Sequence, residues 1–443
     1  MMWRILFILP ALCMGEDGLS LKEAARLAQT QHPSVKAENA RVEAAGMRVE
    51  AARGGYLPKV NYSESFQRSN NPVFVFSGLL MQRRFTEANF NLTALNNPDS
   101  INNFQSVLSA DQTVFDGGET RREVESAQIR KKLTAEEQRL VRMNLAAGAA
   151  QAYFAVLLAE ESLKVAAEAV ASAEADLRRA ESVRAAGMST DADVLSIKVH
   201  LAAMKEQRIR RRSELDVARA ALNEVLGVPL DTPHRLTTPL APLKTAPTGR
   251  ESYEQQAAAE RPDAKQADLA AELSHTQSAL ARAAYLPRVS IRGVLEADRG
   301  RFATQAGGNW FAGVTLRWNL FNGFADRSRI RESGQAIAIS QSRKEQVSAS
   351  LRLQVRKAYA DVTAATERIQ VAEAAVAQAD ESLRIVRNRY ESGLSTVTDL
   401  LRNQVAKLES SFRRLMAIHD QRVAAAMLEL AAGSLTPDSE VLQ

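Results

Sequence analysis

The sequence predicts a mixed, mainly α-helical fold in which two structural repeats each join a long coiled-coil hairpin of helices to a pair of strands. Three observations predict it: a pattern that occurs twice, an apolar residue at every seventh position of long proline-free stretches, and short runs of alternating polar and apolar residues. Only 5% of the residues are aromatic, although 45% are hydrophobic. That composition favours long helices over one large globular core.

The first fifteen residues, MMWRILFILPALCMG, have the order of an export signal. Arg4 precedes an apolar run that extends from Ile5 to Leu12. We therefore predict a signal peptide at 1–15. The only cysteine, Cys13, lies in this segment, and lipid attachment to it is the alternative. The run is shorter than the roughly 18 apolar residues of a spanning helix, and no later run approaches that length, so any membrane crossing requires strands.

A repeated pattern divides the chain. The segment AARGGYLPKV at 51–60 matches LARAAYLPRV at 280–289, and FDG at 115–117 matches FNG at 321–323. The spacing between matching residues is shorter for the second match, which places an insertion in the first copy. Such self-similarity indicates that one structural unit is used twice. We predict a first repeat at 16–228, a proline-rich linker at 229–250, a second repeat at 251–433 and a C-terminal tail at 434–443.

The longest proline-free stretch runs from 120 to 186 and predicts one helix of ~100 Å. Its apolar residues recur every seven positions, and most of them are followed by alanine three positions later. The first copy has Val156, Leu163, Val170 and Leu177 at these positions, and the second copy has Val362, Ile369, Val376 and Leu383. This pattern predicts left-handed coiled coils with closely spaced helices. The helices alone are equally consistent with a soluble coiled-coil dimer.

Four shorter helices are expected to stack end to end in two pairs, each pair lying beside one long helix. The predicted pairs are about 20–55 with about 396–432, and about 190–226 with about 251–284. Each copy would then contribute one long column and one composite column.

Alternating runs follow the YLP motif in each copy. After Pro287, the apolar positions are Val289, Ile291, Gly293 and Leu295, and in the next run they are Ala312, Val314, Leu316, Trp318 and Leu320. The first copy has comparable runs at about 57–68 and 104–115. Runs of ~10 residues with one apolar and one polar face suit a water-filled membrane barrel. Four strands are too few to close one, so several chains must combine.

The insertion in the first copy separates its two strands. It contains an apolar part at 72–85 and a polar part at 92–104. In a barrel it becomes a long hairpin loop on the cell exterior, partly folded over the mouth; in a globular protein its apolar part would enter a core. We favour the loop.

These motifs together resemble the TolC-like outer-membrane efflux proteins. The resemblance rests on the paired Tyr-Leu-Pro motifs, on FDGG at 115–118 with FNGF at 321–324, and on YESGLSTVTDLL at 390–401. It implies a homotrimer in the outer membrane of a Gram-negative bacterium, with twelve strands in one barrel and twelve helical columns in a periplasmic tube. It also implies a periplasmic adaptor and an inner-membrane pump as partners, and outer-membrane lipid around the barrel.

The resemblance places the periplasmic entrance at the turns of the two coiled-coil hairpins. These turns correspond to RAAGMSTDADVL at 184–195 and RYESGLSTVTDL at 389–400. Gly187 and Gly393 suit helix ends that need a left-handed backbone.

Three gate residues are implied by the same match. Asp399 matches a position whose carboxylates form a ring around the constriction. Asp193 matches an aspartate that helps to hold the entrance closed, and Tyr390 matches the tyrosine that is the partner of that aspartate. A second acidic ring lies one turn beyond in one family member, but Arg402 occupies that position here. The alternative for both aspartates is helix capping, since each lies near a helix start. Tyr390 could instead pack within the coil.

The remaining composition argues against catalysis and nucleic-acid binding. Lysine plus arginine number 57 and aspartate plus glutamate 52, and the charges are interleaved, as on solvated helical faces. The five histidines show no metal-ligand spacing, and no phosphate loop or nucleophile motif occurs. We expect no enzyme activity and no cofactor or metal. A soluble periplasmic coiled-coil adaptor is the alternative function, and the cargo stays open among drugs, metal ions and polypeptides.

Overall fold

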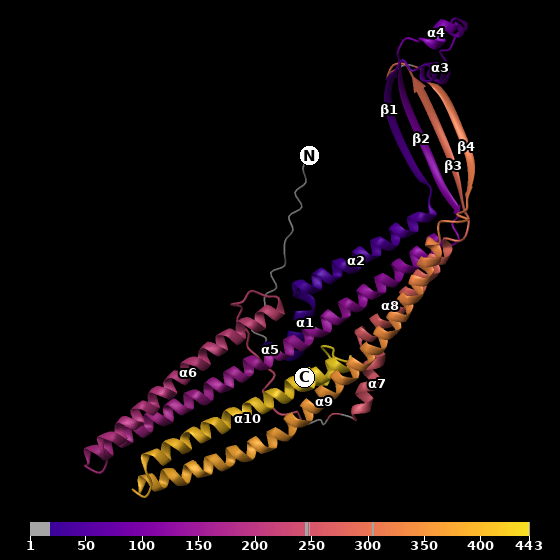
Figure 1. Ribbon diagram of the computed structural model, residues 1–443. Helices are drawn as coiled ribbons and strands as arrows, with labels where there is room; N and C mark the ends of the chain where they lie inside the picture. The colour runs from indigo at the N-terminus through magenta and orange to yellow at the C-terminus, as the bar shows by residue number, and fades with distance from the viewer. Residues whose placement is uncertain (1–17, 244–246, 248, 304, 443) are drawn as a thin grey trace. The chain divides into compact units, whose positions relative to one another are not determined.

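A computed structural model describes residues 18–243, 247, 249–303 and 305–442, and it is mainly helical with one four-stranded sheet (Figure 1). The chain divides into two compact units. One comprises Met1–Arg41, Ala135–Ala267 and Lys344–Gln443, and the other Val42–Thr134 and Asp268–Arg343. The predicted signal peptide and Cys13 lie outside the described residues. Within the described part, no helix combines the length and apolar character needed to cross a membrane.

The two long helices are α5 (Glu119–Ala185) and α9 (Ala325–Glu391), and the first confirms the predicted helix 120–186 within one residue. Each forms a hairpin with a shorter helix, α6 (Asp191–Leu226) or α10 (Val397–Ala432). Residues of the predicted apolar seams are buried, among them Val156, Val170, Val362 and Ile369. The seven-residue pattern therefore identifies the packed faces of both hairpins.

Two helices predicted as continuous are each broken once. The stretch at about 20–55 forms α1 (Leu21–Gln31) and α2 (Pro33–Arg53), and the stretch at about 251–284 forms α7 (Arg250–Glu260) and α8 (Pro262–Ala283). The residue before each proline is extended, with ψ 134° at His32 and 129° at Arg261. Proline disfavours helical backbone at the preceding residue, which explains both breaks.

The predicted end-to-end pairing of the shorter helices is wrong. Helix α6 ends at Gly227 against His32, and α10 ends at Gly433 against Arg261, so each pair forms within one copy. Both glycines have positive φ, and a Cβ would lie 2.8 Å from the His32 Cα in one case and 2.9 Å from the Arg261 nitrogen in the other. Only glycine allows this backbone contact.

The largest core of the first unit surrounds Tyr153 and Phe154. Alanines of α1 and α5 pack closely there, and the Tyr153 side chain is fully buried. Its hydroxyl donates to the Leu19 carbonyl oxygen at 2.9 Å and accepts from the Thr237 and Thr238 nitrogens at 3.0 and 2.9 Å. One side chain thus ties the proline-rich linker to the helices.

Replacing Tyr153 with phenylalanine should lower the free energy of unfolding by ~1–3 kcal/mol, because buried backbone groups lose their partner. The measurement is the denaturant midpoint of the purified protein in detergent. Tyr359→Phe is the control, since Tyr359 occupies the corresponding position of the second copy and its hydroxyl makes no hydrogen bond within the described residues. Equal losses in the two variants would contradict the proposed anchor.

The sheet of the second unit has the order β1-β2-β3-β4, with antiparallel neighbours. Its strands are β1 (Lys59–Ser69), β2 (Ile101–Phe115), β3 (Arg288–Arg299) and β4 (Gly307–Arg317). All four predicted strands are therefore present with small shifts at their ends. One prediction fails in detail: Trp318 and Leu320 lie beyond the end of β4. Strands β1 and β4 are the edges of this sheet.

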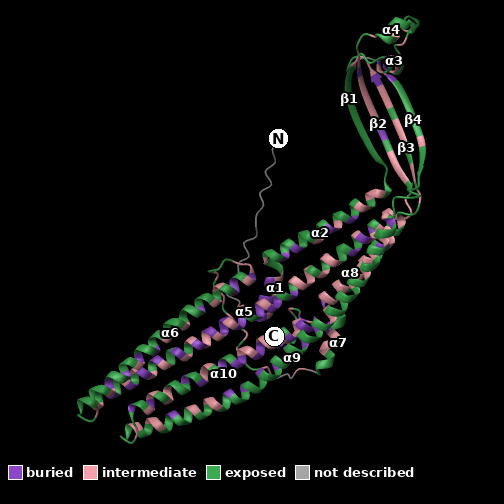
Figure 2. Cartoon of the chain, in the orientation of Figure 1, coloured by how far each residue is buried: buried purple, intermediate pink, exposed green. Residues whose placement is uncertain are grey.

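The two faces of the sheet differ in polarity. One row across it contains Tyr62, Leu108, Leu295 and Trp310, which are 66%, 42%, 58% and 78% exposed. A row on the opposite face contains Ser65, Gln105, Asp298 and Gly307. Figure 2 shows the edge strands as mostly exposed. The chain thus leaves a broad apolar sheet surface uncovered.

The insertion joins β1 to β2 as a hairpin connection, as predicted, but it contains helices. These are α3 (Pro72–Met81), the short 3-10 helix η2 (Glu87–Phe90) and α4 (Leu92–Asn96). The Asn71 side chain accepts hydrogen bonds from the Val73 and Phe74 nitrogens and caps α3. Asparagine followed by proline is a helix-start signal that the apolar character of this segment obscured.

Candidate functional site at the coiled-coil tips

The two hairpin turns have matching backbone geometry. Gly187 and Gly393 have φ of 76° and 74°. In the first turn the Met188 nitrogen donates to the Val183 carbonyl oxygen at 3.1 Å, and in the second the Leu394 nitrogen donates to the Arg389 carbonyl oxygen at 2.8 Å. These bonds close the ends of α5 and α9 in the Schellman pattern. Each turn then leads directly into the capped start of the next helix.

Asp193 is part of the N-terminal cap of α6. Its carboxylate accepts from the Thr190 hydroxyl at 2.8 Å and from the Thr190 nitrogen and the Ser189 hydroxyl at 3.2 Å each. The Thr190 hydroxyl oxygen in turn accepts from the Asp193 nitrogen. The hydrogen bonds from Thr190 lower the pKa of Asp193. The carboxylate is therefore charged at neutral pH and engaged in its own helix.

Asp399 makes the same cap at the start of α10. Its carboxylate accepts from the Thr396 hydroxyl at 2.7 Å and from the Thr396 nitrogen at 3.2 Å. These bonds lower the pKa of Asp399, with a smaller contribution from the positive charge of Arg402. The Asp399 carboxylate lies near the positive charge of Arg402, one turn further along α10, whereas Asp193 has no such cation one turn along α6. In this single chain both aspartates thus act as helix caps, the alternative that the sequence left open.

Tyr390 lies between the two hairpins. It packs on a small apolar cluster that includes Ala180 of α5, Val194 of α6 and Val397 of α10. Burial raises the pKa of Tyr390, and the nearby charges of Asp193 and Asp176 raise it further. Over the described ranges, no hydrogen bond joins its hydroxyl to Asp193. The structure brings these two residues into electrostatic range without bonding them.

Other contacts between the hairpins were missed by the sequence analysis. Asp176 of α5 is 6% exposed and lies 3.5 Å from the Arg387 guanidinium of α9, which also donates to the Ser172 hydroxyl at 3.0 Å. The Gln404 amide of α10 donates to the same Asp176 carboxylate. One turn closer to the tip, Arg179 forms an ion pair with Glu391. Helix α5 is therefore tied to both helices of the second hairpin.

The internal repeat gives no signal for these ties. Asp176 corresponds to Ser382 in the second copy, and Arg387 corresponds to Glu181 in the first. A charged residue adjacent to an apolar seam position was the available clue, because such a residue is buried only when it is paired.

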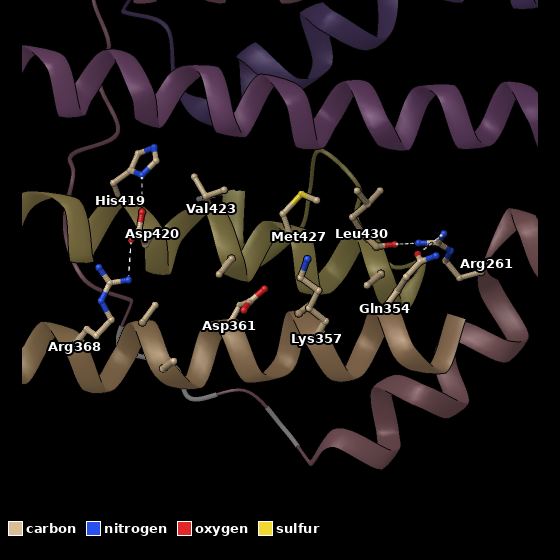
Figure 3. Close-up of a pocket in the computed structure, with 15 residues that line it drawn as sticks. Arg261, Gln354, Lys357, Asp361, Arg368, His419, Asp420, Val423, Met427 and Leu430 are labelled. Carbon is tan, nitrogen blue, oxygen red and sulfur yellow. Dashed lines mark hydrogen bonds and ion pairs between the residues drawn. The ribbon is translucent and has the colours of Figure 1, made fainter. Parts of the chain in front are cut away.

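A groove of about 530 Å³ is lined mainly by α9 and α10 (Figure 3). Alanines line much of it, and some of its charged side chains have partners. The Arg368 guanidinium lies 3.0 Å from the Asp420 carboxylate, and the Arg261 guanidinium donates to the Leu430 carbonyl oxygen at 3.0 Å. Among the described residues, no cluster of three or more histidine, cysteine or acidic side chains could hold a metal ion.

The sequence profile of the outer membrane efflux protein family matches residues 24–228 and 254–434. The chain belongs to this family. Residues 229–253 separate the two matched ranges. This outer membrane efflux protein is thus placed in the outer membrane, as the resemblance implied.

Curated relatives of this outer membrane efflux protein are similar over most of their length. Protein CyaE of Bordetella pertussis is 27% identical over 427 residues, which is 95% of this chain and 85% of the relative. The pyoverdine export outer membrane protein OpmQ of Pseudomonas aeruginosa is 23% identical over 348 residues, covering 76% and 70%.

Solved structures share the fold. CusC superposes with a TM-score of 0.78 at 19% identity, covering 94% of this chain and 92% of CusC. The open state of the MtrE outer membrane channel of Neisseria gonorrhoeae gives a TM-score of 0.77 at 18% identity, covering 96% and 92%. At this identity the likeness establishes the fold alone.

Proposed function

We propose that this outer-membrane efflux channel is a passive homotrimeric duct, gated at its coiled-coil tips, that works with a periplasmic adaptor and an inner-membrane pump. The observation that carries the proposal is the open four-stranded sheet, which has one exposed apolar face, one polar face and two edge strands. Open edges do not occur in lipid, so closure requires further copies. Three copies supply twelve strands. No catalytic step is proposed.

Aromatic side chains at both ends of the sheet support a membrane-spanning role. Near the end that carries the insertion, Phe66 and Phe104 pack with ring centroids 4.7 Å apart. At the opposite end, the Trp318 indole donates to the Tyr285 carbonyl oxygen at 3.0 Å. Aromatic residues flank the apolar band of outer-membrane barrels at both interfaces.

Exposed apolar residues on the helices support assembly in the periplasm. Helix α6 exposes Leu195, Val199 and Ile209, and α9 exposes Leu353 and Val371. Within each helix the spacing of these residues places them on one side of the helix. Contact between such stripes on neighbouring copies would bury them in a closed ring of helices.

The tip contacts support gating by separation of the hairpins. Asp193 and Tyr390 lie near each other, and the ties of Asp176 and Arg179 cross the same boundary. Displacing one hairpin would break these contacts without unfolding either helix pair. An adaptor bound at the tips would supply the required difference in binding energy between closed and open states. The names of the relatives include pyoverdine export, but the tip residues identify no cargo for this chain.

The proposal is tested by the mass of the protein extracted from outer membranes in detergent. We expect a trimer by light scattering and ion conduction in planar bilayers. A monomer that is stable in plain buffer would refute the barrel and favour the soluble periplasmic adaptor instead.

Asp399→Ala should mainly reduce block of the channel by divalent cations, because threefold symmetry would bring three carboxylates around one axis. In the single chain the hydrogen bonds from Thr396 lower the pKa of Asp399, so the carboxylates are charged at neutral pH. Block in the parent channel should therefore be present at neutral pH and be lost as the pH falls through the pKa of this carboxyl group. The measurement is single-channel current with Mg²⁺ added on the side of the tips. Arg402→Ala is the opposite control, since removing that positive charge should strengthen the block.

A further inference from the structure

The insertion is attached to the polar face of the sheet. Gln82, at the end of α3, is 4% exposed, and its amide donates to the Asn102 carbonyl oxygen at 2.8 Å and to the Asn103 side-chain oxygen at 2.9 Å. The Asn103 amide donates to the Asp298 carboxylate at 2.6 Å. Asn103 and Asp298 belong to the rows opposite Tyr62 and Leu108. Helix α3 is thus bonded to two adjacent strands through one polar chain.

Two further contacts hold the same end of α3 against β4. The Arg83 guanidinium donates to the Gly308 carbonyl oxygen at 3.0 Å. A Cβ at Gly307 would collide with the Met81 carbonyl oxygen, whereas a Cβ at Gly308 would meet nothing within 4 Å. The attachment therefore depends on the absence of a side chain at one of two neighbouring glycines.

From these contacts we infer that the insertion is a second gate, which closes the external end of the channel independently of the tips. The inference rests on the proposed function, in which the polar face lines the channel. The helices continue from the opposite end of the strands, so the end that carries α3 faces the exterior (Figure 1). Cargo leaving along the polar face must pass this helix.

The composition of α3 explains how three copies could form a seal. Its sequence, PVFVFSGLLM, is almost entirely apolar, yet Val73, Phe76 and Leu80 are exposed in the single chain. The side chains of α3 that its own chain leaves exposed gain burial only from another surface. Around a threefold axis that surface is the same helix of the other copies. The hydrogen bonds of Gln82 fix the outer end of each helix while the exposed residues meet at the centre.

The test measures access to the polar face from outside intact cells. Apart from Cys13 in the predicted signal peptide the chain has no cysteine, so Asn61→Cys adds a single reactive thiol ~20 Å along β1 from the level of Gln67 and Asn103. A bulky, membrane-impermeant maleimide should label it slowly when the insertion is intact. Gln82→Ala should raise the labelling rate by roughly tenfold, since two hydrogen bonds are lost. Gly307→Val should raise it similarly.

Matched controls separate closure from general damage. Gly308→Val adds the same side chain at the neighbouring position, where a Cβ meets nothing within 4 Å and the carbonyl that accepts from Arg83 is kept. Gln67→Ala removes an exposed glutamine from the polar face. Both should leave the labelling rate unchanged. If the Gly307→Val variant does not assemble, the labelling rates of Gln82→Ala and Gln67→Ala are compared to test the external gate. Equal labelling of the parent, the variants and a chain with 72–98 replaced by a short glycine-serine turn would overturn the external gate and leave the channel intact. No labelling even of the shortened chain would refute the channel itself.

Discussion

Replacing Val314 with arginine is expected to abolish trimer assembly in the outer membrane. Val314 lies on the apolar face of β4 and is 70% exposed in the single chain. On the lipid-facing surface of a membrane barrel, arginine costs ~2–4 kcal/mol near the bilayer midplane. A symmetric trimer carries this cost three times, which is comparable with the whole stability of a typical domain. The amount of trimer in outer-membrane fractions measures the effect.

Thr315→Arg is the matched control for this experiment. Thr315 is the next residue of β4, so its side chain points to the opposite face. On a water-filled polar face arginine is tolerated, and the trimer should form in near-normal amounts. If both variants assemble normally, the apolar face does not contact lipid. If both variants fail to assemble, arginine in β4 disrupts strand pairing, and the result gives no evidence of contact with lipid.

Removing the ties between the hairpins is expected to open the channel. The double variant Asp176→Ala, Arg179→Ala loses the contacts of α5 with Arg387, Gln404 and Glu391. Asp176 is buried and supplies most of the effect, whereas the exposed pair of Arg179 with Glu391 contributes little. Coupling energies of this kind are ~1–3 kcal/mol, which corresponds to a ~5–150-fold shift toward the open state. Single-channel recordings in planar bilayers should show higher conductance and longer open times.

Variants at the tip itself should act in the same direction. Asp193→Ala and Tyr390→Phe remove a charge and a hydroxyl that lie near each other between the hairpins, and each should raise conductance. Glu174→Ala is the control, because Glu174 pairs with Lys205 at 3.1 Å and so joins α5 to α6 within one hairpin. Wild-type conductance in the Asp193, Tyr390 and Asp176 variants would leave Asp193 as a helix cap only.

The helices could be predicted in extent but not in arrangement. The seven-residue pattern and the absence of proline located α5 within one residue, because both signals are local. The partner of each shorter helix depended on contacts such as Gly227 with His32, which join residues far apart in the sequence. The breaks at His32 and Arg261 were available from the following prolines, which disfavour helical backbone at the residue before them.

The candidate site was predicted only in part for a similar reason. The resemblance located the two turns, and Gly187 and Gly393 within them suited a left-handed helix end; both have φ above zero. Asp176 and Arg387 were missed because neither belongs to a local motif and their pairing crosses two hairpins. The role of Gln82 was likewise hidden, since its partners on β2 are separated from it by two further short helices.

The order of the strands also determines when the sheet can form during synthesis and export. The hairpins β1–β2 and β3–β4 each pair within one copy, but the central pairing joins β2 to β3 across the whole α5–α6 hairpin and the linker. Pairing over such sequence separation is slow, because loop closure must precede the contacts. Before β3 has emerged, β2 therefore has an unpaired edge and the first copy alone cannot build the sheet.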